Sequence, residues 1–290
     1  MKFGNLELFI IDDGKFRLDG GAMFGVVPKI MWSKTDAADE NNRILLSANC
    51  LLIKSGEHIA LVDNGMGNKW NDKSGEMFAV EQPRQLVPEL ERLGVKPEDV
   101  THMILSHLHF DHAGGSTYKD EAGNIHPQFP NARYYIQKGE WEVAHSPTPR
   151  DKASYLPENL APLWDAGLVE LVDGDAEVFP GVKMIITGGH TDSHCVISIE
   201  SEGYTAWFLA DLIPTSSHIQ VPYVMGYDLF PQQTMEYKER LLEEMYRDRH
   251  LLIFEHGPIV KAGRLAKNDR GKWVIDKFDL NNAEVYEITK

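Results

Sequence analysis

A short segment of the chain concentrates side chains that bind metal ions. His107, His109, Asp111 and His112 fall within six residues, directly after the apolar run at residues 100–105. A single histidine is more often a hydrogen-bonding residue, but three imidazoles and a carboxylate crowded together are costly without a cation. Mixed His and carboxylate ligation suits zinc and its first-row neighbours. At a strand end, His107 and His109 can point one way while Asp111 and His112 reach a neighbouring position, so the segment predicts two adjacent metal ions.

The segments around this motif are typical of short strands and helices joined by turn residues. Apolar runs predict strands in the first half at residues 6–11, 44–53, 58–62 and 100–105, with Asp12-Asp13-Gly14 as a turn after the first. Further strands are predicted at residues 169–186, 196–209 and 251–254, with edge strands and a turn at Gly271 in residues 262–290. Helical periodicity appears at residues 85–93 and 234–249. We interpret residues 1–290 as a single α/β domain whose strand ends carry the polar motifs.

Composition excludes several classes of protein. With 290 residues, 42% hydrophobic and 25% charged, the chain can bury a core large enough to carry an enzyme pocket. A net charge of -15 disfavours a nucleic-acid partner, which would need clustered Lys and Arg. Glu7 interrupts the region where a secretion signal would be apolar, and no apolar run is long enough to span a membrane, so we expect a cytoplasmic protein without membrane association. Cys50 and Cys195 are too few for a disulfide framework.

The H-x-H-x-D-H motif after a strand resembles the signature of the metallo-β-lactamase superfamily. Four further segments resemble that family's motifs in the same order: Leu61-Val62-Asp63-Asn64-Gly65, Gly188-Gly189-His190-Thr191-Asp192-Ser193-His194, Leu209-Ala210-Asp211 and Phe254-Glu255-His256-Gly257. The resemblance implies a four-layer αβ/βα sandwich of the α/β (α+β) class, with the metals at one edge of its sheets. It also implies two divalent metal ions, zinc first, with iron, manganese or cobalt as alternatives.

The resemblance assigns each ligand of such a pair. One metal would take His107, His109 and His190, the other Asp111, His112 and His256, with Asp211 bridging the two. A metal-bridging hydroxide would then attack an ester or lactone carbonyl, and Asp111 could pass the proton to the leaving group, which makes Asp111 and Asp211 the catalytic residues. We expect Asp63 to orient a ligand imidazole, and His194 to be a buried, hydrogen-bonded histidine beside the site, because the ligand positions are already filled.

The branch that the sequence most resembles is that of the quorum-quenching lactonases and organophosphate-cleaving hydrolases. Several lactonases carry a substrate-binding Tyr three residues beyond the bridging Asp, where this chain has Pro214, so Tyr223 or Tyr227 would have to replace it. Met23, Phe24 and Phe110 are further candidates for the wall of a substrate pocket.

These comparisons favour a small-molecule substrate similar to an acyl-homoserine lactone. Phosphotriesters or aryl esters at the same site are the alternative within the class. An iron-dependent dioxygenase of a small thiol compound is an alternative from another class, disfavoured because a lone iron needs fewer ligands, and a non-catalytic sensor would lack ligands that are present here. The resemblance also allows a homodimer, with residues 16–32 as the contact segment.

Overall fold

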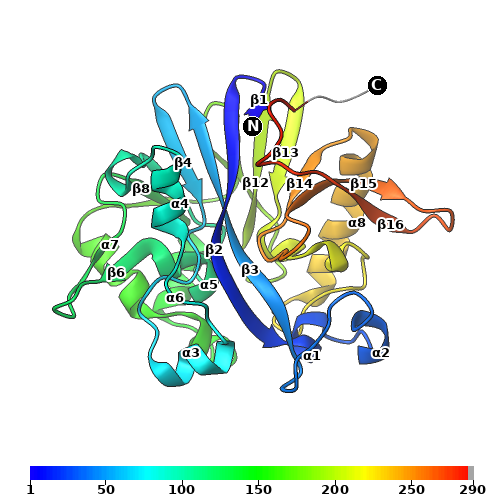
Figure 1. Cartoon of the computed structure of the whole chain (residues 1–290), viewed down its shortest axis with the longest axis horizontal. Helices are drawn as coiled ribbons and strands as arrows, with labels where there is room; N and C mark the ends of the chain where they lie inside the picture. The colour runs from blue at the N-terminus through cyan, green and yellow to red at the C-terminus, as the bar shows by residue number, and fades with distance from the viewer. Residues whose placement is uncertain (287–290) are drawn as a thin grey trace.

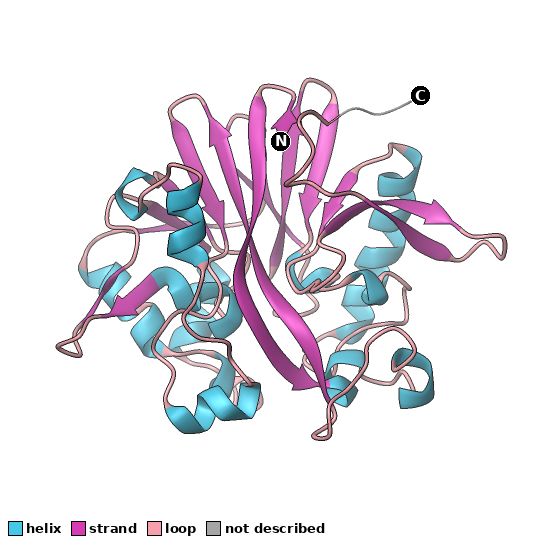
Figure 2. Cartoon of the chain, viewed as in Figure 1, coloured by secondary structure: helices cyan, strands magenta, loops and turns pink. Residues whose placement is uncertain are grey.

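Two seven-stranded sheets lie face to face between outer layers of helices in the computed structural model, which describes residues 1–286 (Figures 1 and 2). The first sheet has the strand order β1 (Lys2–Phe3), β2 (Leu6–Asp19), β3 (Arg43–Ser55), β4 (His58–Val62), β5 (His102–Ile104), β8 (Arg133–Gln137), β9 (Val169–Val172). The second has the order β10 (Ala176–Phe179), β11 (Val182–Ile186), β12 (Cys195–Ser201), β13 (Tyr204–Phe208), β14 (Leu251–Ile253), β15 (Ala262–Lys267), β16 (Trp273–Lys277). A separate hairpin consists of β6 (Thr117–Lys119) and β7 (Ile125–Pro127).

Helices cover the outer face of each sheet, which gives the four-layer αβ/βα sandwich that the sequence resemblance predicted. The α-helices are α1 (Gly20–Phe24), α2 (Lys29–Trp32), α3 (Asp72–Phe78), α4 (Leu86–Arg92), α5 (Phe110–Ala113), α6 (Lys138–His145), α7 (Ala161–Asp165) and α8 (Pro231–Arg247). Apolar residues of α4, α6 and α7 pack on the first sheet, and those of α8 pack on the second. No helix among residues 1–286 combines the length and the apolar composition that crossing a bilayer requires.

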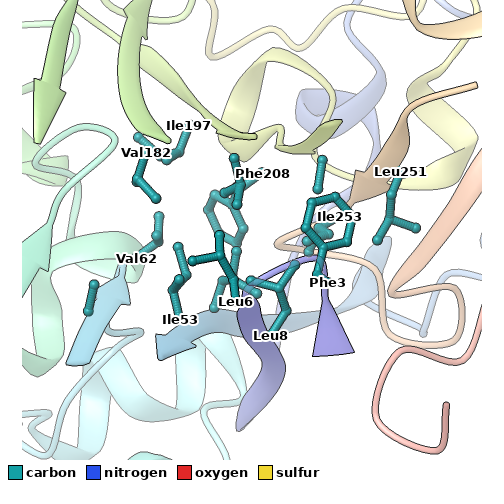
Figure 3. Close-up of a cluster of buried hydrophobic side chains, with 14 of the residues drawn as sticks. Phe3, Leu6, Leu8, Ile53, Val62, Val182, Ile197, Phe208, Leu251 and Ile253 are labelled. Carbon is teal, nitrogen blue, oxygen red and sulfur yellow. The ribbon is translucent and has the colours of Figure 1, made fainter. Parts of the chain in front are cut away.

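The inner faces of the two sheets form the central core. Phe3, Leu8 and Ile53 from the first sheet meet Ile197 and Phe208 from the second, and all five are almost completely buried (Figure 3). Burial of large aliphatic and aromatic side chains stabilises a fold by roughly 1.5–3 kcal/mol each, so this layer holds the two sheets in a fixed relation.

The strands that carry the polar motifs end at the same edge of this sandwich. β4 and β5 run parallel in the first sheet, and β13 and β14 run parallel in the second. Parallel neighbours end at a common edge, so the segments that follow these four strands emerge close together. This shared edge is where loops from both sheets can combine into one site.

The first long strand differs from its prediction. Asp12-Asp13-Gly14 does not end the strand, because β2 continues to Asp19 through a shift in its register with β3 between Asp12 and Lys15. Gly14 adopts a φ of 115° in this bulge, which L-residues rarely reach. The extended β2–β3 pair then reaches α1 below the sheets (Figure 1). Of the edge strands predicted in residues 262–290, only β16 lies at the edge of its sheet, because β15 pairs with both β14 and β16. The turn at Gly271 joins β15 and β16, and residues 287–290 lie outside the described part of the chain.

The backbone of residues 64–66, which follow β4, lies directly against Gly114 and Gly115, which follow α5. The space between the two backbones is too small for a side chain. A Cβ at Gly115 would collide with the backbone carbonyl of Asn64, and one at Gly114 would collide with the backbone of Met66. Asn64 also donates a hydrogen bond across this contact, from its N–H to the carbonyl oxygen of His112 at 2.8 Å. The two glycines therefore allow the segment that carries the predicted metal ligands to lie directly against the end of β4.

We expect Gly115→Ala to destabilise the protein by about 1–3 kcal/mol, because the new methyl group forces two backbones apart. Gly75→Ala is the matched control: it lies in α3, where the nearest atom to the new Cβ is 4.0 Å away, and alanine favours a helix by up to about 1 kcal/mol. Urea unfolding of both variants measures the difference. Equal midpoints for Gly115→Ala and the wild type would contradict the close packing of these segments.

Candidate metal centre

All seven predicted ligands meet at the shared edge of the two sheets. His107 follows β5, His109 caps the start of α5, and Asp111 and His112 lie within α5. The other three come from the second half of the chain, on the segments after β11, β13 and β14: His190, Asp211 and His256. Each of the seven is at most 8% exposed. Separate loops therefore bring five imidazoles and two carboxylates into one buried cluster.

The side chains fall into two groups that share Asp211. His107, His109 and His190 offer ligand atoms within 4.8 Å of one another, and Asp111, His112 and His256 form a second such group. Asp211 faces both groups, with Oδ2 3.1 Å from His190 Nε2 and Oδ1 3.1 Å from His256 Nε2. This arrangement suits two metal ions with one carboxylate between them.

The chemistry of these atoms fits divalent cations. Among the described residues, Nε2 of His107, Nε2 of His109 and Oδ1 of Asp211 are buried without a hydrogen-bond partner. Burial and then neighbouring imidazoles lower the pKa of His107 and His109 well below the usual range, so both rings are neutral and have a free lone pair. Buried polar atoms normally have partners, and neutral imidazole with carboxylate is a donor set that zinc and related metals accept.

Carboxylates hold the second ring nitrogen of His112. Asp63, directly after β4, places Oδ2 3.0 Å from His112 Nδ1, and Glu255 places Oε2 2.8 Å from the same atom. Asp63 also accepts hydrogen bonds from the N–H and the hydroxyl of Ser106. Burial opposes protonation of His112, but Glu255, Asp211 and Asp111 together raise its pKa well above the usual range. Asp63 thus lies where it can orient an imidazole. Glu255, which sequence reasoning missed, places a second carboxylate beside the same nitrogen, but neither of its oxygens has a hydrogen-bond partner among the described residues.

Two other ligands are anchored in the same way. His190 Nδ1 lies 3.0 Å from Asp228 Oδ1, and His256 Nδ1 lies 2.9 Å from the carbonyl oxygen of Ser47. His194 Nε2 accepts a hydrogen bond from the backbone N–H of Asp211 at 3.1 Å. This bond fixes the backbone of the residue whose carboxylate faces both ligand groups. Sequence reasoning missed Asp228, because no spacing pattern links it to His190. The adjacency of Glu255 to His256 was the one signal that could have found Glu255.

A cavity of about 340 Å³ opens onto the cluster, and His109, Asp111, His190, Asp211 and His256 reach its surface. Of the five side chains expected in a substrate pocket, Met23, Phe110 and Tyr227 line this cavity. Apolar lining also comes from residues that sequence reasoning missed: Leu18, Phe78, Met225 and Leu229.

Phe24 and Tyr223 differ from the expectation, because both belong to a neighbouring aromatic cluster. The ring of Phe24 is fully buried and stacks on Trp32 and His218, with centroid distances of 5.4 and 4.4 Å. Tyr223 packs edge-on against Phe24. Pro214 is buried and its carbonyl oxygen accepts the N–H of His256 at 2.9 Å, so this residue supports a ligand through its backbone.

We expect Asp228→Ala to lower zinc affinity by about 10–100-fold, because His190 loses the partner that fixes its ring. Competition with a chromophoric chelator measures the affinity. Asp173→Ala, which removes a carboxylate with 85% of its side chain exposed, is the matched control and should bind zinc as the wild type does. Equal affinities of the Asp228→Ala variant and this control would show that Asp228 does not position His190 for a metal.

Comparison with known proteins places the chain in a family. The sequence pattern of the metallo-beta-lactamase superfamily matches residues 43–256. The N-acyl homoserine lactonase of Bacillus thuringiensis is 28% identical over 220 residues, 71% of this chain and 80% of the relative. A "probable metal-dependent hydrolase" from Staphylococcus aureus has a similar structure, with a TM-score of 0.86 and 32% identity over 96% of this chain and 99% of that chain.

A second solved structure is similar in fold alone. AidC, a dizinc quorum-quenching lactonase in complex with a product, has a TM-score of 0.78 at 22% identity, over 96% of this chain and 97% of its own. The superfamily pattern covers most of the chain and contains all seven clustered ligands, from His107 to His256. The chain, a metal-dependent hydrolase, therefore belongs to the metallo-β-lactamase superfamily.

Proposed function

We propose that this protein hydrolyses esters or lactones at a two-metal site, with acyl-homoserine-lactone-like compounds as its first substrate class. The observation that carries the proposal is the position of Asp211, whose two oxygens face two separate groups of buried ligands. His107, His109 and His190 would hold one ion, and Asp111, His112 and His256 the other. Two zinc ions bound there would supply a hydroxide nucleophile at neutral pH and polarise the substrate carbonyl.

Asp111 is the proposed proton carrier. Its carboxylate lies at the floor of the cavity, with Oδ2 3.7 Å from His256 Nε2 and Oδ1 3.9 Å from His112 Nε2. Both oxygens therefore lie beside candidate ligand imidazoles, and one would serve as a ligand while the other carries the proton. Asp111 would accept the proton of the attacking water and donate it to the leaving alcohol.

Tyr227 is the proposed donor to the substrate carbonyl, the role that Pro214 cannot fill. Its side chain lines the cavity that contains Asp111 and Asp211. Burial, followed by the charges of Asp111, Asp19 and Asp211, raises the pKa of Tyr227 to about 12. The phenol therefore stays protonated at neutral pH and keeps its O–H available to donate.

The rest of the cavity favours an apolar substrate body. Leu18, Met23, Phe78, Phe110 and Met225 form much of its wall, and a volume of about 340 Å³ suits a small molecule. The relatives named N-acyl homoserine lactonase act on substrates with an acyl chain, which supports the same class here. A complete set of seven ligands argues against a mononuclear iron dioxygenase, which would leave several of them unused.

We expect the zinc-loaded protein to open lactones with a rate that depends on acyl-chain length. The test is proton release on a panel from short γ-lactones to long-chain acyl-homoserine lactones. Asp211→Asn should lower kcat/KM at least about 100-fold, because it removes the charge shared by the two ligand groups. Asp173→Asn changes the same charge at an exposed turn and should match the wild type.

A wild-type rate no higher than that of Asp211→Asn on every lactone would contradict the lactonase proposal. Phosphotriesters and aryl esters would then be assayed with the same two variants. Hydrolysis of phosphotriesters or aryl esters alone would change the proposed substrate class and leave the proposed two-metal site unchanged.

A further inference from the structure

An arginine side chain bridges two loops at the mouth of the cavity. Arg150 follows α6 and lines the cavity together with Ser154, which lies in the same segment. Its Nη2 donates to the carbonyl oxygens of Gly226 at 2.6 Å and Asp228 at 2.9 Å, on the opposite loop. Two bonds from one nitrogen fix the plane of the guanidinium group across the opening.

This guanidinium has no carboxylate partner within residues 1–286. The neighbouring Asp151 also lines the cavity, where its Oδ1 accepts from the hydroxyl of Thr148 and its Oδ2 has no hydrogen-bond partner among the described residues. The carboxylate of Asp228 accepts from His190 and from the N–H of Met225. Both bonds that Arg150 makes through its side chain use Nη2. The donors on Nε and Nη1 therefore have no hydrogen-bond partner in the described part of the chain.

The cavity thus has different chemistry at its two ends. The candidate metal ligands lie at the floor, apolar side chains such as Phe110 and Met225 form the wall, and Arg150 lies at the rim. Each remaining N–H of the guanidinium can donate one charge-assisted hydrogen bond to an anionic oxygen, and such a bond is stronger than one to a neutral group. The net charge of the chain is -15, so an unpaired cation beside the site is not part of a general basic surface.

On the basis of the proposed hydrolase function, we propose that Arg150 determines specificity by binding an anionic group, a carboxylate, at the distal end of the substrate. The substrate class is then an ester or lactone with an apolar middle and a free acid at the far end from the carbonyl that is attacked. A neutral acyl chain would leave the free donors of Arg150 to water.

Other contacts hold the loop that Arg150 touches, so recognition can be tested apart from folding. The buried Lys238 donates from Nζ to the carbonyl oxygens of His218, Gln220 and Tyr223 at 2.6, 2.9 and 2.8 Å. These bonds fix the first part of the loop from inside the protein. Replacing Arg150 with a neutral side chain leaves all of them in place.

The experiment compares two lactones that differ only in distal charge. One is homoserine lactone acylated with adipic acid, with its terminal carboxylate free, and the other carries the primary amide in place of that carboxylate. We expect the wild type to prefer the acid and Arg150→Gln to reduce the acid-to-amide ratio of kcat/KM at least about tenfold, mainly through KM. Arg150→Lys should restore part of the preference. Arg270→Gln, which removes the same charge at the exposed turn after β15, should leave the ratio unchanged.

Three results would overturn this inference. An equal ratio in the wild type and Arg150→Gln, with both lactones hydrolysed, would reject the role of Arg150 and leave the hydrolase function intact. An equal loss on both lactones in Arg150→Gln would show that the residue acts through the loop and not through the substrate. Hydrolysis of neither lactone by the wild type would reject the lactonase function and, with it, the inference that depends on it.

Discussion

The structure depends on burying five imidazoles and two carboxylates side by side at one edge of the sandwich. Such a cluster is expensive, because polar atoms without partners and uncompensated charges lose their hydration. Backbone and side-chain partners satisfy one nitrogen of each of His112, His190 and His256. Three further ligand atoms have no hydrogen-bond partner among the described residues: Nε2 of His107, Nε2 of His109 and Oδ1 of Asp211. Two divalent cations would satisfy these atoms, so we interpret the cluster as a site completed by metal.

This constraint explains several features of the fold that lie outside the site. Both sheets must end at the same edge, and the core between them keeps those ends in register. The loop after β4 must contact the segment after α5, and a Cβ at position 114 or 115 would collide with the backbone of that loop, so both positions require glycine. The loop that carries Asp228 has little regular structure, and it is held by Lys238 on one side and Arg150 on the other. Ligand support, cavity wall and cavity rim are therefore parts of one packed unit.

The sequence predicted the elements whose signals are local. The crowding of His107, His109, Asp111 and His112 indicated the metal cluster, and hydrophobic periodicity located α4, α8 and most strands within a few residues. Contacts between distant segments left no such signal. Asp228 supports a histidine far away in the sequence, and Phe24 faces Trp32 and His218 instead of the cavity, because tertiary packing decides the direction of a side chain. The bulge at Gly14 kept β2 continuous where turn-forming residues predicted an end.

The most direct test of the two-metal interpretation is zinc stoichiometry measured together with thermal stability. Protein stripped with a chelator and titrated with zinc should bind two equivalents per chain, and Tm should rise by more than about 5 °C at saturation, because metal binds the folded chain in preference to the unfolded one. Binding of one equivalent or none, with a Tm that zinc leaves unchanged, would contradict the account.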